Sequence, residues 1–192
     1  MEETKALAMN PRSLPLFILS TFLLSFFFIN GANGDSNLVT KVCKVSAERD
    51  PNLKYTFCLE SFQAVPNSQN ATLRGLGFIS VKLTHYNTVR VLTLIKELLN
   101  KNSDNKSRGR LQDCLSVYSR AVYDTRDALL AFRSGDYQSA NMHVSASMDA
   151  SKVCEDGFAM STEGARPPLG NNNKEIFGLS AVALFIINML AK

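Results

Sequence analysis

Side chains of the kinds that do chemistry crowd one stretch of the chain, RSGDYQSANMHVSASMDASKVCEDGF, which runs from Arg133 to Phe158. It holds serines, a histidine, aspartates and a cysteine, the residue types that supply nucleophiles, general bases and general acids. If the stretch is helical, Ser139 and Ser147 each lie one turn from His143, so a serine–histidine contact is geometrically possible. A nucleophile with its base is therefore the first hypothesis.

The other members of a catalytic set do not fit on the same helix. His143 and Cys154 are 11 residues apart, about 16 Å along a helix, which is beyond any hydrogen bond. Asp136 is seven residues from His143, too far to orient the imidazole within one straight helix. Cys154 is expected to be oxidised, as argued below, and a disulfide-bonded cysteine is no nucleophile. We therefore predict that the chain is not an enzyme and has no catalytic residue.

The N-terminus has the composition of a secretory signal. Lys5 and Arg12 precede the apolar run LPLFILSTFLLSFFFI, and the small residues NGANG follow it. Ala32-Asn33-Gly34 fits the small-x-small pattern of a signal-peptidase site, so we predict a signal peptide over residues 1–34. A retained membrane anchor is the disfavoured alternative, because an apolar run of about 16 residues is short for a span.

Residues 35–192 then form one domain of ordinary length. The whole chain has 21 Lys and Arg against 17 Asp and Glu, a formal net charge of +4. No basic run is interleaved with aromatic residues, so we expect no nucleic-acid partner.

All four cysteines follow the predicted cleavage point: Cys43, Cys58, Cys114 and Cys154. An even number in a secreted chain indicates two disulfides, for which three connectivities are possible. A zinc site is disfavoured because the sequence has no CxxC pair and only two histidines. We therefore expect neither a metal nor a cofactor.

Two sequons, at Asn70 and Asn105, are candidate N-glycosylation sites and agree with the secretory route.

Apolar residues recur at steps of three and four along most of the chain, which predicts an all-α fold. One long amphipathic helix starts at Leu73; its apolar positions include Tyr86, and their phase slips near Arg90. The polar run Asn100–Gly109 reads as a linker. In chain order the predicted helices are two short pieces around Asp50-Pro51-Asn52 (together 35–66), then Leu73 to Leu98, Leu111 to Phe132, Tyr137 to Cys154, and the apolar C-terminal segment.

The turn between the second and third long helices has strong local signals. Gly135 supplies the left-handed residue that follows many helices, and Asp136 is a good N-cap for the next one. The third helix is rich in serine and alanine, which either permits close helix packing or makes a flat surface for a partner. We favour packing, and the two interpretations are compatible.

The C-terminal segment, EIFGLSAVALFIINMLAK, follows the loop Ala165–Asn173 and is apolar nearly all round. A glycolipid-anchor signal needs a longer polar spacer, and a membrane span needs more residues without interruption. We favour the buried fourth helix of a bundle over residues 70–192, and expect no stable membrane association.

The positions of the cysteines favour one connectivity. Cys114 lies 20 residues before Ser134, and Cys154 lies 19 residues after Gly135, so antiparallel helices place both about 30 Å from the turn. Cys43 and Cys58 bracket Pro51 in the same way. We predict the pairs Cys43–Cys58 and Cys114–Cys154; the crossed pairings remain possible from sequence.

Two segments, CKVSAERDPNLKYTFCLESF and DCLSVYSRAVYDTRDALLAFRSGDYQSANMHVSASMDASKVCEDGF, resemble the plant invertase and pectin methylesterase inhibitor family. The resemblance covers nearly all of the predicted mature chain and is strongest to a pollen-allergen subgroup. It implies an antiparallel up-and-down four-helix bundle with an N-terminal helical hairpin stapled by a disulfide, and the same cysteine pairing. It also implies a secreted, reversible one-to-one inhibitor of a cell-wall carbohydrate enzyme.

The family divides by target. Certain invertase inhibitors carry Pro-Lys-Phe directly after the Gly-Asp that opens the third bundle helix, where this chain has Tyr137-Gln138-Ser139. This departure favours pectin methylesterase as the partner over acid invertase, and a non-inhibitory secreted bundle is the third alternative. Asp136, Tyr137 and Gln138 are the candidate target-binding residues. The implied location is the apoplast and cell wall, with the vacuole disfavoured.

Overall fold

The structure, a computed structural model, describes residues 38–101, 105–160 and 168–192. The predicted signal peptide lies outside these residues. Every regular element within them is helical, as predicted. In chain order they are α2 (Leu38–Arg49), α3 (Tyr55–Gln63), the 3-10 helix η1 (Ser68–Asn70), α4 (Leu73–Asn100), α5 (Asn105–Ser134), α6 (Tyr137–Ala159) and α7 (Gly170–Leu190).

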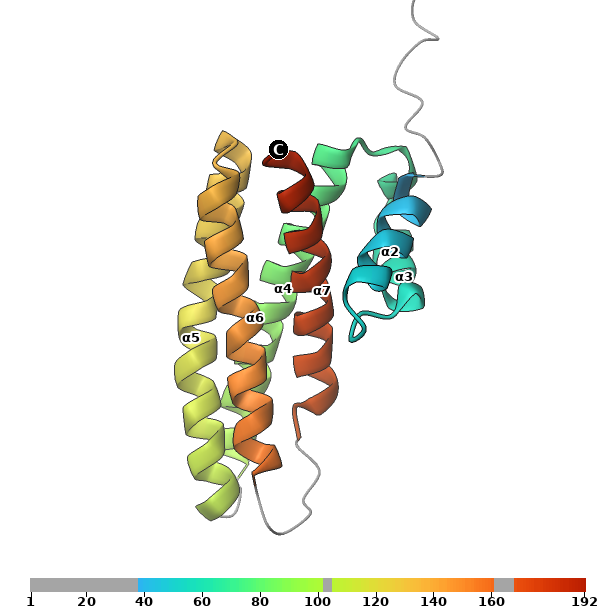
Figure 1. Ribbon diagram of the computed structural model, residues 1–192. Helices are drawn as coiled ribbons and strands as arrows, with labels where there is room; N and C mark the ends of the chain where they lie inside the picture. The colour runs from blue at the N-terminus through green and yellow to red at the C-terminus, as the bar shows by residue number, and fades with distance from the viewer. Residues whose placement is uncertain (1–37, 102–104, 161–167) are drawn as a thin grey trace, which may run out of the picture. The chain divides into compact units, whose positions relative to one another are not determined.

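The four long helices form an antiparallel up-and-down bundle (Figure 1). Phe78, near the start of α4, meets Phe132, near the end of α5. Asn141, in the first turns of α6, bonds Asn188, near the end of α7. The helix α7 also packs along α4, so each long helix has two neighbours and the ring is closed.

The turn between α5 and α6 has the geometry that its sequence predicts. Gly135 adopts a positive φ of 82°. Its N–H donates to Phe132 O at 3.2 Å, and the N–H of Asp136 donates to Ala131 O at 2.9 Å. These two bonds make a Schellman motif, which satisfies carbonyls at the end of α5.

The bundle core consists of two apolar clusters with hydroxyl side chains between them. One cluster surrounds Tyr118 near the Cys114–Cys154 bridge, and the other surrounds Phe132 near the α5–α6 turn. Thr84 and Thr88 lie buried between them, and each donates to the carbonyl four residues earlier on its own helix. Because these hydroxyls are satisfied locally, the core accepts them at little cost.

This arrangement corrects one feature of the predicted apolar face of α4. Tyr86, expected on that face, is 67% exposed. The phase slip near Arg90 arises because threonines, which a hydrophobic pattern does not count, occupy the core positions at this level.

The short helices α2 and α3 form a hairpin that packs on α7 (Figure 1). The hairpin contacts α7 at a glycine, Gly178. A Cβ at this position would lie 2.5 Å from Cε1 of Phe57. The phenyl ring therefore lies directly against the α7 backbone. The α2–α3 hairpin and its apolar cluster agree with the N-terminal helical hairpin expected from the sequence.

Two predicted loops are shorter than expected because helices begin inside them. The run Asn100–Gly109 was predicted as a linker, but α5 starts at Asn105, and Arg108 donates to Leu99 O at the end of α4. The segment Ala165–Asn173 was predicted as a loop, but α7 starts at Gly170. Polar composition alone does not distinguish a loop from the first turn of a helix that is exposed to solvent or hydrogen-bonded to another helix.

The helix α7 is long and apolar enough to cross a membrane by length and composition. In the structure it packs against α4, α6 and the hairpin, and residues such as Ile176, Ala183 and Ile187 are fully buried. It has the place predicted for the fourth helix of the bundle.

Candidate functional site

The two disulfides have the predicted connectivity. Cys43 is bonded to Cys58 and Cys114 to Cys154, with Cα–Cα distances of 5.5 and 4.9 Å. The first bridge closes the α2–α3 hairpin, and the second joins α5 to α6 far from their turn. All four sulfur-bearing residues are buried.

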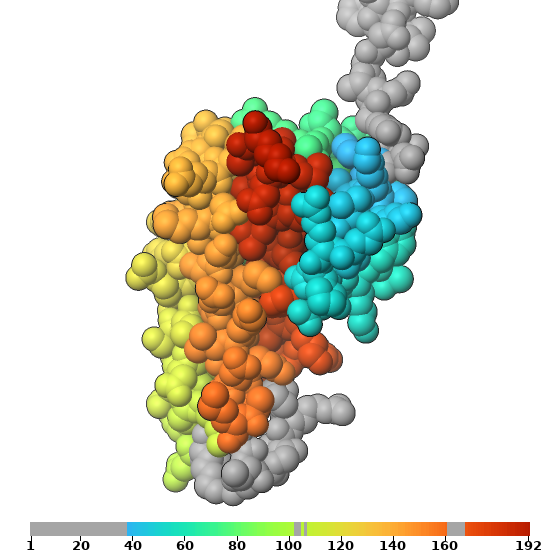
Figure 2. All heavy atoms as spheres, in the orientation of Figure 1, coloured from blue at the N-terminus to red at the C-terminus, as the bar shows by residue number. Residues whose placement is uncertain are grey.

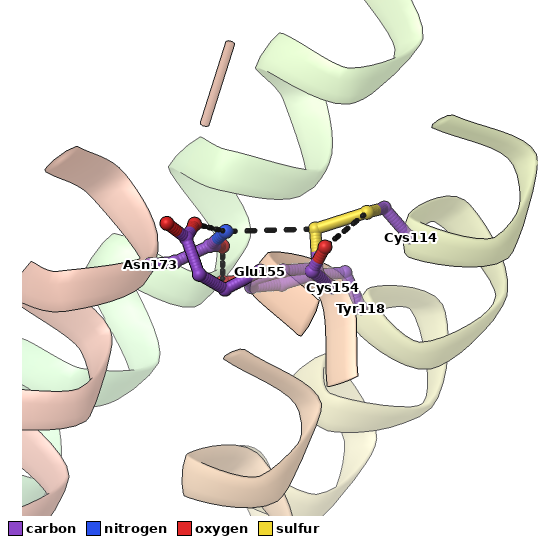
Figure 3. The surroundings of a disulfide bond; sticks show 5 residues. All are labelled: Cys114, Tyr118, Cys154, Glu155 and Asn173. Carbon is purple, nitrogen blue, oxygen red and sulfur yellow. Dashed lines mark hydrogen bonds between the residues drawn. A yellow bond between two sulfur atoms is a disulfide. The ribbon is translucent and has the colours of Figure 1, made fainter. Parts of the chain in front are cut away.

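A polar network that the sequence did not predict surrounds the second bridge (Figure 3). Asn173, on α7, is 2% exposed. Its Oδ1 accepts from the Tyr118 hydroxyl of α5 at 2.8 Å, and its Nδ2 donates to Glu155 Oε2 of α6 at 2.9 Å. Burial, with the Glu155 charge adding to it, raises the pKa of Tyr118. Asn173 thus connects three bundle helices beside the disulfide.

The three candidate target-binding residues lie together at the α5–α6 tip, but their side chains differ in exposure and in their contacts within the bundle. Asp136 caps α6, its Oδ1 accepting from the N–H of Ser139 at 3.0 Å. Hydrogen bonds from Ser139, from its side chain first and then its backbone, lower the pKa of Asp136. The half-buried Tyr137 ring makes a T-shaped contact with the Phe132 ring, with the ring centroids 5.3 Å apart. Gln138 is exposed.

The serine–histidine hypothesis finds no geometry in its favour. His143 Nδ1 lies 3.3 Å from Asp124 Oδ1, across the α5–α6 interface. Ser147 is fully buried and faces Thr88 instead, with their hydroxyl oxygens 3.3 Å apart. His143 therefore contacts a carboxylate, and within the described residues it makes no hydrogen bond with Ser139 or Ser147.

The small residues of α6 serve packing, as favoured from the sequence. Ala140, Ser147 and Ala150 of α6 are buried, as are Ala121 and Ala128 of α5, and the two helices pack along each other. Small side chains at this seam let the two helix backbones approach closely enough for Cys154 to reach its partner.

The outer face of α6 carries exposed apolar side chains. Met142 is 61% exposed, Val153 54% and Met160 82%. Their spacing of 11 and seven residues places them on one side of the helix, and α6 runs down the face shown in Figure 2. We call these three residues the α6 stripe.

Both sequon asparagines are exposed, Asn70 at the end of η1 and Asn105 at the start of α5. Within the described ranges, no group of three or more His, Cys, Asp or Glu residues could hold a metal ion.

Comparison with known proteins agrees with this architecture. The family model for plant invertase/pectin methylesterase inhibitors matches residues 37–186. A protein from Platanus orientalis named as a candidate invertase inhibitor is 36% identical, over 88% of this chain and 97% of the relative. A pectinesterase inhibitor from Actinidia deliciosa is 30% identical, over 76% of this chain and 78% of the relative.

Among solved structures, a mutant form of a pectin methylesterase inhibitor from Arabidopsis superposes with a TM-score of 0.63 at 27% identity. The match covers 70% of this chain and 89% of that one. With its two disulfides, its hairpin and its closed ring of four long helices, the chain belongs to the plant invertase/pectin methylesterase inhibitor family.

Proposed function

We propose that the chain is secreted after loss of residues 1–34 and inhibits a pectin methylesterase of the plant cell wall through a reversible one-to-one complex. The family match and the pectinesterase inhibitor among its relatives support an inhibitory role. The apoplast is the proposed location, because the target acts on wall pectin.

The packing of Tyr137 is the observation that favours pectin methylesterase over acid invertase as the target. In certain invertase inhibitors of the family, a Pro-Lys-Phe tripeptide at this position fills the enzyme's active site. Here the Tyr137 ring packs against Phe132 of α5, and Ser139 is half-buried and bonded to the N-capping Asp136. Such a first turn has little to insert into a deep active site.

Acid invertase is the second candidate target. The observation in its favour is the similarity to the Platanus orientalis protein, whose name gives invertase as its target.

We propose that the contact surface runs from the α5–α6 tip along the α6 stripe. Gln138 and the N-capping Asp136 supply polar groups at the tip, and Met142 continues the surface with exposed apolar area. The exposed Asp149 and Asp156 lie on the same side of α6 between the apolar side chains of the α6 stripe, and a surface of mixed apolar and charged residues is typical of a protein–protein contact. Tyr137, which is half-buried, contributes the exposed part of its side chain.

A parallel inhibition assay tests the target. The purified protein, beginning at residue 35, is added to a plant pectin methylesterase and to a plant acid invertase at mildly acidic pH. We expect saturable inhibition of the esterase at a 1:1 ratio and an unaffected invertase. Inhibition of the invertase alone would identify acid invertase as the target. If both enzymes stayed fully active, the proposed inhibitory function would be refuted.

A matched pair of substitutions tests the surface. Met142→Glu places a charge on the α6 stripe, and Tyr86→Glu places one on α4, at a side chain of similar exposure, 67% against 61%. We expect Met142→Glu to weaken inhibition at least tenfold, or about 1.4 kcal/mol, and Tyr86→Glu to leave it unchanged. Equal effects would exclude the α6 stripe as the contact.

We also propose that Asn70 and Asn105 carry glycans, since both side chains are exposed. Treatment of the plant-expressed protein with a peptide N-glycosidase should lower its mass by two glycans, and an unchanged mass would refute the assignment.

A further inference from the structure

A cleft of about 880 Å³ opens where the hairpin overhangs the N-terminal half of α7. The stretch Pro51–Lys54 and Phe57 form one wall, and Ser151, Lys152 and Glu155 of α6 form the other. Figure 2 shows the hairpin ending just above the first turns of α7 on this face. The volume is in the range of ordinary ligand sites, and neither the catalytic hypothesis nor the proposed target surface uses it.

Both walls are fixed before any ligand arrives. The Cys43–Cys58 bridge closes the hairpin, and Phe57 is seated against Gly178 on the floor of the cleft. On the opposite side, Glu155 is held by Asn173 Nδ2 at 2.9 Å. A cleft with rigid walls loses little conformational entropy when it binds.

The charges in the cleft are not balanced. Three lysines line it: Lys54, Lys152 and Lys174. Of its two carboxylates, Glu155 accepts from Asn173, and Glu175 is paired with Arg90 at 2.6 Å. Lys152 lies over the Phe177 ring at 5.6 Å. Lys54 and Lys174 are exposed and have no carboxylate partner in the described part of the chain. The cleft therefore has cationic groups available for an anionic ligand.

The remaining lining favours a sugar over other anions. The rings of Phe57 and Phe177 are half-buried and offer apolar surface, and the carboxamides of Asn52 and Asn171 are exposed donors and acceptors. Apolar ring surface combined with a few polar groups suits a ligand with hydroxyls on a carbon ring. Carboxylates on that ligand would complete the match with Lys54 and Lys174.

We propose that this cleft binds an acidic oligosaccharide, with sugar carboxylates at Lys54 and Lys174 and sugar rings against Phe57 and Phe177. The identity of the sugar as galacturonate rests on the proposed function, because a pectin methylesterase converts methyl esters of pectin into carboxylates. Such binding retains the inhibitor on stretches of pectin that the enzyme has already de-esterified.

Calorimetric titration of the folded mature protein, with no enzyme present, tests the proposal separately from inhibition. The probe is an oligogalacturonate, and the two controls are its fully methyl-esterified form and an oligoglutamate of equal charge. We expect binding of the oligogalacturonate only, weakening as salt rises. Absent binding, or equal binding of either control, would overturn the proposal. Inhibition can succeed or fail independently of this result.

Two double variants with the same net charge locate the site. The variant Lys54→Gln/Lys174→Gln removes the free cations of the cleft, and Lys82→Gln/Lys96→Gln removes two exposed lysines of α4. We expect roughly tenfold weaker oligogalacturonate binding for the first variant and less than twofold for the second. Equal losses of affinity in the two variants would show that the oligogalacturonate is attracted only by the net charge of the protein. That result would overturn the assignment of the binding site to the cleft. Unchanged thermal midpoints would show that both variants fold.

Discussion

At the scale of single residues, Asn173 links α7 to both α5 and α6 beside the Cys114–Cys154 bridge. It is buried, yet its oxygen and nitrogen both have partners, on α5 and α6 respectively. A carboxamide that loses such a partner inside a core leaves an unsatisfied group, which costs more than the bond itself contributes. Asn173 therefore holds α7 in register with its neighbours beside the second disulfide.

Replacing Asn173 by alanine leaves the buried Tyr118 hydroxyl without its acceptor. We expect the free energy of unfolding to fall by about 2–3 kcal/mol. Tyr118→Phe removes the hydroxyl as well as its need for a partner, and should cost about 1 kcal/mol. Urea unfolding of both variants and of the double variant measures the coupling. Strictly additive losses would show that the bond contributes nothing.

Asp136 gives the stability of the α5–α6 tip a defined pH dependence. Its pKa is lowered from the ordinary 3.8 by bonds from Ser139. A carboxylate with a depressed folded-state pKa stabilises the fold above its unfolded-state pKa, and this contribution disappears as pH falls through the folded-state value. Asn at the same position caps the helix without titrating.

The thermal midpoint of the original protein, measured relative to that of Asp136→Asn, should thus be constant above about pH 5. It should fall as the pH drops below the ordinary Asp pKa of 3.8, because only the original protein loses a charged cap. Thermal unfolding from pH 7 to pH 2.5 measures it, and a difference that stays constant over this range would show that the capping bond has no preference for the charged form.

At the scale of elements, glycine positions decide where helices touch. Gly178 brings the Phe57 ring of α3 onto the α7 backbone, and Gly77 brings α4 close to Phe132 of α5. Gly157 on α6 has nothing within 4 Å of its Cβ position. Helical glycines in this chain therefore differ in role, and the difference is testable with a single methyl group.

We expect Gly178→Ala to destabilise the protein by about 1–3 kcal/mol, because the new Cβ overlaps the Phe57 ring and displaces the hairpin. Gly157→Ala is the matched control and should be neutral or stabilising by up to about 1 kcal/mol, since alanine favours a helix. Hydrogen exchange should show the loss for Gly178→Ala first in α2 and α3. Equal behaviour of the two variants would mean that the hairpin is not seated at Gly178.

The helices and the α5–α6 turn were predictable because their signals are local. Glycine at a left-handed position, an N-cap, and apolar steps of three and four are all visible along the chain. The starts of α5 and α7 were not, because Arg108 and Asn173 find their partners on other helices. The exposure of Tyr86 was missed because threonines take its place in the core. The cleft joins residues from the hairpin, α6 and α7, and no local pattern indicates it.

At the scale of the whole molecule, the two disulfides stabilise parts of very different character. The hairpin is small and shares its apolar cluster with α4 and α7, so it has little core of its own. The α5–α6 pair has extensive packing, and its bridge closes a separation of 40 residues against 15 for the other.

Replacing both cysteines of each bridge by alanine should separate these roles. Loss of the Cys114–Cys154 bridge is expected to lower the free energy of unfolding by about 4 kcal/mol, and loss of Cys43–Cys58 by about 3 kcal/mol, from the chain entropy released in the unfolded state. In the variant that lacks the Cys43–Cys58 bridge, a protease should cut the α2–α3 hairpin while the four-helix bundle stays helical by circular dichroism. A bundle that unfolds together with the hairpin would contradict this division.

The closing of the ring by α7 has a consequence for the order of folding. The helices α5 and α6 are joined by a tight turn, so their contacts form at short sequence separation. By contrast, Arg90 and Glu175, which join α4 to α7, are 85 residues apart. Local contacts form before distant ones, because distant pairs must first overcome the entropy of closing a long loop. We therefore expect the α5–α6 pair to form first, and α7, the most apolar of the described helices, to be covered last. During folding, the α7 surface and the hairpin that rests on it are the parts most in need of protection from aggregation.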